Sequence, residues 1–567
     1  MHDARPAPPP EQEYAGPEHG QADDNRAGDQ PSARKALAPG GVALSSGPSG
    51  ATVERPARRA PESRGRRMAE PDTVIRYGTA RGRWVILATV LGSSMALLDA
   101  TVVGIALPAM GRDFDAGMDG LQWVVNGYTL TLAGFLLQAG ALADRYGRRK
   151  VFLIGVVWFA LASLLCAVAW NAESLIGARA LQGVGAALLT PGSLAILQAS
   201  FGPGDRAKAI GAWSGLGGVA AAAGPFIGGY LIDLVSWRLI FAINLPMAVA
   251  IVVVALRHVP ESRDPAAATR KADGAGAFLA PLGLAGLTYG LIEGPARGWG
   301  APLVVACLVG GLALLAAFVL VELRTSHPML PMGVFRSVQF SAANFVTLLV
   351  YGALGGALFL LPIALQQVSG YSPIQAGTAL LPFTVLMLLL SARMGALAAR
   401  IGPRLPMTIG PIIAGAGLAL LARIDTDGDY LTQVLPAVLV FGFGMTITVA
   451  PLTSTVLDAA PASLVGIASA VNNDVARAGG LLAVAILPPA AGIAGDTYLD
   501  AARFSSGFHT AVLLAAAAAV LGGVVSAFGI RNPERVPEPA RPAERQHSHC
   551  ALDGPPLRTR EPAELRA

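Results

Sequence analysis

Long apolar runs alternate with short polar loops through most of the chain. A helix needs about twenty apolar residues to cross a bilayer, and such runs recur between residues 83 and 529. The first six lie at 83–109, 119–143, 151–170, 173–199, 207–231 and 237–257. Two more lie at 275–293 and 301–321, and six follow at 339–364, 374–394, 404–422, 431–456, 464–490 and 509–529. The pattern predicts an all-α integral membrane protein with fourteen transmembrane helices, grouped six, two and six.

Polar stretches divide the chain into five segments. Residues 1–82 and 531–567 are rich in proline, alanine, glycine and charge and have no apolar period, so we expect two disordered tails. Between the tails the runs predict an N-terminal six-helix bundle at 83–257 and a C-terminal six-helix bundle at 339–530. Residues 258–338 join the bundles through a polar loop and the two extra central helices.

Composition supports the membrane assignment and excludes several other classes. Only 14% of the 567 residues are charged and 53% are hydrophobic, whereas soluble domains are about 25% charged. The formal net charge is +5, but the basic residues lie in tails and short loops without aromatic side chains between them, which argues against nucleic acid as a partner. The three cysteines have no disulfide or metal-site spacing, and no GxxxxGK[ST] loop for ATP occurs.

The loops on one side of the predicted membrane carry most of the positive charge. Basic residues gather in the loops at 145–150, 206–208, 257–271, 324–336 and 393–404. The loops on the other side have only Arg112, Arg238, Arg297, Arg423 and Arg503. By the positive-inside rule, both termini are expected in the cytoplasm.

One charged loop sequence occurs twice. "GALADRYGRRK" at 140–150 returns at 395–405 as "GALAARIGPRL", with Gly, Ala, Leu, Ala, Arg, Gly and Arg in register. Each copy follows the second helix of its bundle, as expected of parallel repeats related by an axis along the membrane normal. Ala399 stands where the first copy has Asp144, so the turn itself does not require the acid. We expect Asp144 to accept from a nearby arginine or to face a helix N-terminus, a contact that could lock one conformation.

Four stretches together resemble the major facilitator superfamily over about residues 83–530, and the six-two-six arrangement is similar to its fourteen-span drug:proton antiporter family. "LDATVVGIALP" resembles the first-helix motif and "GALADRYGRRK" the cytoplasmic loop motif. "RALQGVGAALLTPG" and "GLGGVAAAAGPFIGG" resemble the fourth-helix and fifth-helix motifs. The four stretches lie at 98–108, 140–150, 179–192 and 215–229. "WRLIFAINLP" resembles the start of the sixth helix but has Leu239 where a second tryptophan is frequent.

Two charged residues inside predicted helices are candidate proton-coupling groups. An ionisable side chain at mid-membrane costs at least about 2.5–3.5 kcal/mol, so it is a functional-site hypothesis by default. Asp99 could bind and release a proton, or it could be a structural carboxyl held by hydrogen bonds. Arg179, which opens the fourth-helix motif, has proton coupling as its family role. It cannot deprotonate, so it could act only as a fixed charge near Asp99, or it could extend toward the outer surface.

A second acid, Asp474, lies in the thirteenth predicted helix within "VNNDVARAGG". Arg477 is three residues further along and therefore on the same helix face. Asp474 is a third candidate for proton coupling, although the two charges could simply neutralise each other. Asn472 and Asn473 beside them could form a polar wall for a substrate.

The motifs also supply candidate gating and cavity residues. Small residues and a proline in the fifth helix permit close helix packing and a kink, and the resemblance assigns this motif to closing the bundle against leak. The gating candidates are Gly140, Asp144, Arg145, Gly147, Arg148, Arg149, Gly224, Pro225, Gly228 and Gly229. The substrate-cavity candidates are Asn126, Tyr128, Gln182, Asn472 and Asn473.

The resemblance implies the major facilitator fold and a proton-coupled antiporter. Such a protein would export lipophilic drugs, dyes or antibiotics, and the proton gradient would supply the energy without a cofactor or metal. The alanine-, glycine- and arginine-rich composition fits a high-GC bacterium, so we expect the bacterial plasma membrane and a monomer that is sufficient for transport. A proton-coupled or passive importer on the same fold is the alternative. A sensor or intramembrane enzyme is disfavoured, because no folded soluble domain and no catalytic constellation is predicted.

Overall fold

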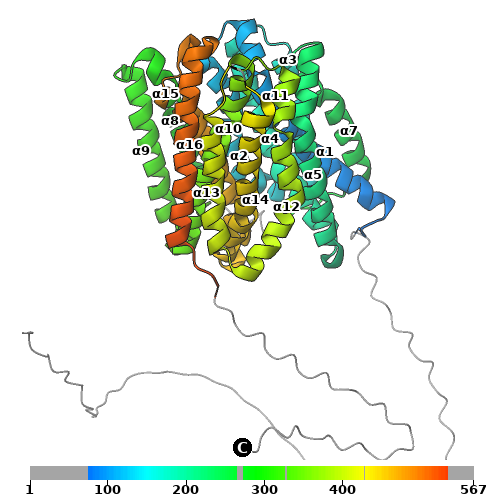
Figure 1. Ribbon diagram of the computed structural model, residues 1–567. Coiled ribbons are helices and arrows are strands. Elements are labelled where there is room, and N and C mark those ends of the chain that lie inside the picture. Colours follow the sequence, from blue (N-terminus) through cyan, green and yellow to red (C-terminus); the bar gives the residue numbers. More distant parts are fainter. Residues whose placement is uncertain (1–74, 265–272, 326–327, 427, 534–567) are drawn as a thin grey trace, which may run out of the picture. The chain divides into compact units, whose positions relative to one another are not determined.

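The computed structural model describes residues 75–264, 273–325, 328–426 and 428–533 (Figure 1). In these residues, thirteen helices are long and apolar enough to cross a membrane. A fourteenth long helix, α2 (Met118–Tyr146), lies among them but is more polar, with side chains such as Gln122 and Asn126 buried inside the protein. Every predicted span therefore corresponds to a helix, and the multi-pass membrane fold is confirmed.

The first bundle contains six spans, the last of which is interrupted. Its helices are α1 (Ala80–Phe114), α2 (Met118–Tyr146), α3 (Arg148–Ala167), α4 (Ala172–Ser200), α5 (Pro203–Leu234), α6 (Leu239–Ala242) and α7 (Asn244–His258). Helices α6 and α7 together form the sixth span. Two further helices, α8 (Gly274–Arg297) and α9 (Pro302–Arg324), form a hairpin.

The second bundle repeats the six-span pattern. A short 3-10 helix, η1 (Met332–Arg336), leads into α10 (Val338–Gln367). The following helices are α11 (Pro373–Ala379), α12 (Leu381–Ile401), α13 (Arg404–Leu421), α14 (Leu435–Asp458), α15 (Val465–Ala490) and α16 (Ala501–Gly529). Short turns precede three of them, namely η2 (Tyr430–Val434), η3 (Ala462–Leu464) and η4 (Gly495–Leu499).

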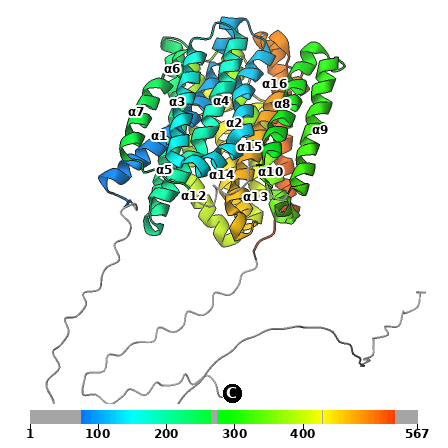
Figure 2. The same cartoon turned by 180° about the vertical axis from the view of Figure 1, so that it is seen from behind.

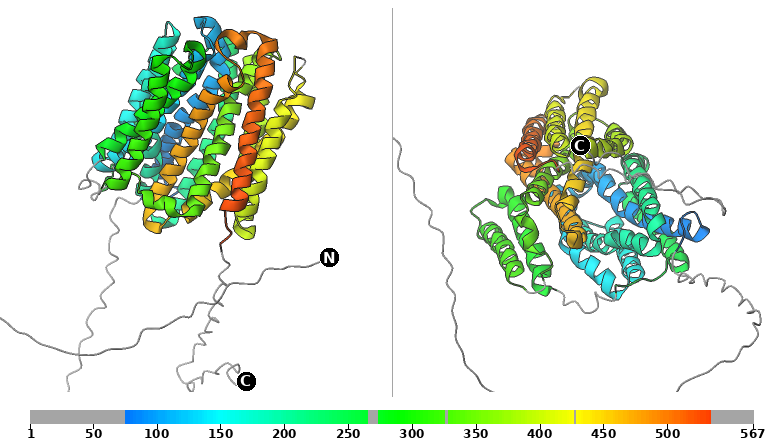
Figure 3. Two further views of the ribbon diagram at one scale, coloured as in Figure 1. Left: turned by 90° about the vertical axis from the view of Figure 1, so that its left-hand side faces the viewer. Right: turned by 90° about the horizontal axis from the view of Figure 1, so that it is seen from below.

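The α8–α9 hairpin lies outside the two bundles, beside their junction (Figures 2 and 3). Helix α8 is joined to α2 at both ends. Near one end, Trp123 Nε1 donates to Glu293 Oε1 at 3.0 Å. Near the other end, Gln138 Nε2 donates to the Ala277 carbonyl at 3.1 Å. Because α8 also packs against α15, the hairpin covers one edge of the seam between the bundles.

The largest difference between a predicted and an observed helix start occurs at a helix that a polar side chain caps. Helix α16 begins at Ala501, eight residues before the predicted 509, because Asp500 Oδ1 accepts from the backbone N–H groups of Ala502 and Arg503, both at 3.1 Å. Such a cap satisfies N–H groups that the helix leaves free. Likewise Thr79 caps α1, so the last part of the predicted tail at 1–82 is ordered, and residues 531–533 are also described. The rest of both predicted tails lies outside the described residues.

We define the proximal end as the end at which α1 begins and α16 ends, and the distal end as the opposite one. Both copies of the repeated loop are proximal, since they follow α2 and α12. The short connection between α1 and α2 is distal. The predicted topology makes the proximal end cytoplasmic.

Candidate functional site

A buried ion pair links α1 and α4 inside the first bundle. Asp99 of α1 is 3% exposed and Arg179 of α4 is 1% exposed. Arg179 Nη1 donates to Asp99 Oδ2 and, at 2.6 Å, to Gln182 Oε1. The Gln182 amide nitrogen in turn donates to Asp99 Oδ1 at 2.8 Å. Both carboxylate oxygens of Asp99 are therefore satisfied, and the two charges that sequence analysis singled out are in direct contact.

Arg179 is held in the bundle on its other sides as well. Its Nε donates to the Val124 carbonyl at 3.1 Å, and its guanidinium carbon lies 4.3 Å from the centre of the Tyr128 ring. A cation over an aromatic face is attracted by the ring quadrupole. Arg179 therefore does not extend to the outer surface, and this alternative from sequence analysis is wrong.

Two polar partners of the ion pair were missed by sequence analysis. Ser163 of α3 is fully buried, and its Oγ accepts from Gln182 Nε2 at 2.8 Å. Asn244, the first residue of α7, donates to the same Oγ at 3.3 Å. Asn244 lies in "WRLIFAINLP", so its motif was a usable signal. Ser163 lies in an apolar run, and only the folded arrangement identifies it.

Asp99 and Arg179 balance each other's charge inside the bundle. Removing one charge of a buried pair leaves the other without compensation, which costs about 3–5 kcal/mol. A proton on Asp99 would neutralise its carboxylate and leave Arg179 with the Gln182 and Val124 oxygens. Proton binding therefore favours any rearrangement of α1 and α4 that gives Arg179 a new partner.

The two bundles are joined by hydrogen bonds at their distal halves. Gln122 Nε2 donates to the Val484 carbonyl at 2.6 Å, and Asn126 Nδ2 donates to the Leu481 carbonyl at 3.3 Å. Gln366 at the end of α10 reaches back to the Ile105 carbonyl of α1 at 2.9 Å. Among the described residues, hydrogen bonds between the bundles occur only in the distal half.

Two further contacts close the distal seam. Asp233 near the end of α5 accepts from Ser372 Oγ at 3.0 Å and from the Ile374 N–H at 2.9 Å, so it adds to the cap of α11. Tyr498 donates its hydroxyl to the Ala116 carbonyl at 2.7 Å. Burial, together with the charge of Asp496, raises the pKa of Tyr498. The hydroxyl consequently keeps the proton that it donates.

The last part of the fifth-helix motif, residues 224–229, lies at this distal seam. A Cβ on Gly224 would lie 2.4 Å from Thr101 Oγ1, and one on Gly228 would lie 2.4 Å from a Val102 methyl carbon. These glycines allow α5 to approach α1 within its own bundle. A Cβ on Gly229 would lie 2.6 Å from Ile374 Cα, in the other bundle.

Pro225 of α5 also faces the other bundle. A Cβ on Gly377 of α11 would lie 2.3 Å from the carbonyl oxygen of Pro225. The small residues of α5 therefore pack against both bundles at once. By contrast, a Cβ on Gly211 or Gly215, in the proximal half of α5, would meet nothing within 4 Å.

The first copy of the repeated loop forms a local charge pair. Arg148 Nη2 lies 2.8 Å from Asp144 Oδ1, and the Asp144 side chain is 39% exposed. Arg145 is exposed and lies over the Tyr146 ring. Gly140 has nothing within 4 Å of its Cβ position. Asp144 thus accepts from a nearby arginine, as the sequence predicted.

Besides Asp144, a second acid contacts this loop from a distant part of the chain. Glu261, which follows α7, accepts from the backbone N–H groups of Arg149 and Lys150 at 3.0 and 3.1 Å. A carboxylate at this position caps α3 and complements the positive end of its dipole. Sequence analysis did not identify Glu261, because nothing local indicates that it reaches a loop more than a hundred residues earlier.

In α15, Asp474 and Arg477 do not form an ion pair. The described residues provide no hydrogen-bond partner for Asp474 Oδ1 or Arg477 Nε, although both atoms are buried. Arg477 lies close enough to Tyr128 of the first bundle to interact with it electrostatically. The two side chains therefore form no salt bridge in this conformation, but the charge of Arg477 still acts on Asp474.

The five predicted cavity residues have different environments. Tyr128 and Gln182 are buried around the ion pair, and Asn126 is buried at the distal seam. Asn472 is 9% exposed and donates to Thr347 Oγ1 of α10 at 2.7 Å. Asn473 is exposed and donates to the Ser469 carbonyl of its own helix at 2.9 Å.

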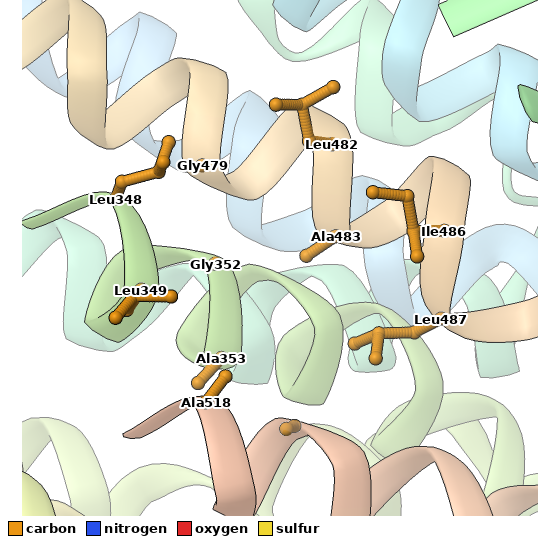
Figure 4. A pocket seen from close by; sticks show the side chains of 11 residues that line it. Leu348, Leu349, Gly352, Ala353, Gly479, Leu482, Ala483, Ile486, Leu487 and Ala518 are labelled. Atoms are coloured by element: carbon orange, nitrogen blue, oxygen red, sulfur yellow. The ribbon is translucent and has the colours of Figure 1, made fainter. Parts of the chain in front are cut away.

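A separate apolar pocket of about 230 Å³ lies within the second bundle (Figure 4). Its walls come from α10, α15 and α16, and include Leu348, Gly352, Gly479, Leu482 and Ala515. No candidate from sequence analysis lines it. Within the described part of the chain, no group of three or more His, Cys, Asp and Glu side chains could hold a metal ion.

Comparison with known sequences points to one family. The sequence model of the Major Facilitator Superfamily matches residues 89–484. The chain is 36% identical over 409 residues to the tetracenomycin C resistance and export protein of Streptomyces glaucescens, which covers 72% of this chain and 76% of the relative. It is 39% identical over 413 residues to the puromycin resistance protein pur8 of Streptomyces alboniger, covering 71% of this chain and 81% of the relative.

Solved structures share the fold at low sequence identity. A peptide transporter POT has a TM-score of 0.59 with 14% identity over 80% of this chain and 96% of that chain. A bacterial homologue of the human lysosomal transporter Spinster, in an inward-facing and unoccupied conformation, has a TM-score of 0.56 with 15% identity over 80% of this chain and 99% of that chain.

Proposed function

The chain belongs to the Major Facilitator Superfamily, and from this premise we propose that it is a proton-coupled antiporter. It would export lipophilic drugs, dyes or antibiotics across the bacterial plasma membrane by alternating access. Its relatives are named as antibiotic or multidrug resistance and export proteins, which supports drug efflux. The substrate is then a small molecule, and protons are the coupling ion.

The buried Asp99–Arg179 pair is the observation that carries the proton-coupling proposal. A charge pair inside a span is costly and is retained where it has a task. In the proposed cycle, a proton displaces Arg179 from Asp99 and α1 shifts relative to α4. Release of the proton on the other side restores the pair. Asp474, whose Oδ1 is unpartnered, is the proposed second proton-binding carboxylate.

The distal seam supports alternating access. Hydrogen bonds between the bundles occur at the distal half among the described residues, while the proximal half of α5 has glycines with open space beside them. With both termini in the cytoplasm, this conformation would be closed to the outside and ready to load substrate from the cytoplasmic side. Opening the distal seam and closing the proximal half would release the substrate outside.

We place the substrate between the two bundles. Asn473, Asp474 and Arg477 lie within little more than one turn of α15, and Arg477 interacts across the seam with Tyr128. Because the cavity would lie within one chain, a monomer is sufficient. Each proton moving inward supplies about 2.3 kcal/mol per 100 mV, which corresponds to roughly fifty-fold substrate accumulation at perfect coupling.

Ethidium efflux from preloaded cells tests the proposal. Cells that express the protein are expected to lose ethidium faster than cells without it. A protonophore added midway should abolish this difference in the rate of ethidium loss. Asp99→Asn should abolish the difference while the protein remains folded and inserted, because an amide cannot cycle a proton. Asp113→Asn is the matched control, since Asp113 is an exposed carboxylate on the same helix that pairs with Arg238.

Two outcomes would contradict the proposal. Normal efflux from Asp99→Asn would remove Asp99 from proton coupling. If transport screens with several compounds in both directions showed only uptake, the protein would be an importer.

A further inference from the structure

Two carboxyl groups meet at the proximal end of the α8–α9 hairpin. Asp273 is the N-cap of α8, and Glu322 lies near the end of α9. A Cβ placed on Gly276 would lie 2.7 Å from Asp273 Oδ2 and 2.7 Å from Glu322 Oε1. The two oxygens therefore converge on one small space, which is open only because residue 276 is a glycine.

Neither of these two oxygens has a hydrogen-bond partner. Both oxygen atoms are buried, and Glu322 as a whole is only 3% exposed. The other oxygen of each carboxyl group is engaged. Asp273 Oδ1 accepts from the Gly276 N–H at 3.0 Å, and Glu322 Oε2 accepts from the Leu330 N–H at 3.1 Å.

The elements packed around the pair bring no compensating cation among the described residues. Arg324 ends α9 and Arg336 ends η1, but neither forms a salt bridge with Asp273 or Glu322. From α2, the amide nitrogen of Gln138 donates to the Ala277 carbonyl, one residue after Gly276. The hydrogen bonds to the pair thus come from backbone N–H groups.

Two ionised carboxylates whose buried, unpartnered oxygens converge repel each other unless a proton or cation lies between them. We propose that Asp273 and Glu322 form a proton-binding site that holds one shared proton. The proton bridges Asp273 Oδ2 and Glu322 Oε1, so the pair carries one negative charge rather than two. Such a pair titrates as a unit.

The shared proton has a mechanical consequence, because Glu322 also holds the chain that leads to the second bundle. Its Oε2 accepts from Leu330, in the segment that runs from α9 through η1 into α10. Loss of the proton creates repulsion between the end of α9 and the start of α8. The site therefore couples pH at the proximal end to the attachment of this linker, independently of Asp99 and of the transport proposal.

Hydrogen–deuterium exchange of the full-length protein in nanodiscs tests the site. After correction for intrinsic exchange, the segment 328–337 should lose about tenfold in protection as the pH rises from about 5 to about 9. Glu322→Gln and Asp273→Asn should remove this dependence, because each amide can donate to the remaining carboxylate at every pH. Glu293→Gln, at the distal end of α8, is the matched control and should keep the dependence of the unmodified protein.

Three outcomes would overturn the proposal. The first is protection of 328–337 that does not change with pH in the unmodified protein. The second is the same pH dependence in Glu322→Gln and Asp273→Asn as in the unmodified protein. The third is protection at high pH that returns with Mg²⁺ or Ca²⁺ and disappears with a chelator, which would identify a cation site instead. Size-exclusion elution of each variant checks its folding, and either amide variant alone is sufficient for the test.

Discussion

The two copies of the repeated loop share a backbone but differ in charge. Gly147 and Gly402 both have positive φ angles, 116° and 92°, which favour glycine. The segment after the last helix of each bundle folds against this glycine. A Cβ on Gly147 would lie 2.8 Å from the Glu261 carboxyl group, and one on Gly402 would lie 2.3 Å from the Asn532 side chain.

The same segments cap the third helix of each bundle. Glu261 accepts from two N–H groups of α3, and Asn532 Oδ1 accepts from the Arg404 N–H of α13 at 3.0 Å. Arg149 is the residue of the first copy that aligns with Arg404. Its side chain donates to the Val259 carbonyl, in the same segment as Glu261, at 3.0 Å. A neutral amide thus serves in the second bundle where a carboxylate serves in the first, so the fold requires a glycine and a cap but no acid.

The bundle interiors differ in the same way. The first bundle buries the ion pair of Asp99 and Arg179, whereas the second joins α10 and α15 through the neutral Asn472 and Thr347, and its charged residues Asp474 and Arg477 form no salt bridge with each other. Since neutral groups can hold an equivalent bundle together, packing alone does not explain the charges of the first. This difference is consistent with the proposed roles of these charges in proton coupling and gating.

Breaking the interior pair should have the largest effect. Asp99→Leu leaves Arg179 buried without its charge partner and should lower the free energy of unfolding by about 3–5 kcal/mol. Asp99→Leu with Arg179→Met should recover most of the loss. Asn472→Ala in the second bundle should cost only about 1 kcal/mol, because it removes neutral hydrogen bonds. Unfolding in mixed micelles, followed by tryptophan fluorescence, measures all three. A double variant as unstable as the single one would contradict this account.

The loop glycines should give an intermediate effect that is equal in both copies. Gly147→Ala and Gly402→Ala place a Cβ in a left-handed conformation and against a capping side chain, which should cost about 1–3 kcal/mol each. Gly140→Ala is the control. It lies inside helix α2 with open space at its Cβ, so alanine should stabilise by about 0.5–1 kcal/mol. The same unfolding assay applies, and a large cost in only one copy would show that the loops are not equivalent.

Sequence alone could predict the spans, because apolar run length is a local property. All fourteen runs became helices, and the start of α16 was missed only because Asp500 caps a polar turn. The cost of a charge inside a span singled out Asp99, and the fourth-helix motif singled out Arg179. The fold brings the two into contact.

The remaining site features depend on contacts between distant segments. Ser163 supports the pair from an apolar helix, and Gln366 reaches a carbonyl 261 residues earlier in the chain. No local pattern indicates either contact, because each partner is chosen by helix packing. For the same reason, the sequence could not tell that Asp474 and Arg477, although on one helix face, would leave each other unpaired.

Exchanging the loop acid should have the smallest effect on stability. Asp144 and Arg148 form a partly exposed pair four residues apart, and such pairs contribute about 0.2–1 kcal/mol. Asp144→Ala, which makes the first copy resemble the second, should therefore change unfolding very little but should slow ethidium efflux if the acid acts in gating. Ala399→Asp should leave both properties unchanged, because the second copy has Pro403 where the first has Arg148. The second copy folds without an acid at this position. If Asp144→Ala left efflux unchanged, the acid would be dispensable for transport as well.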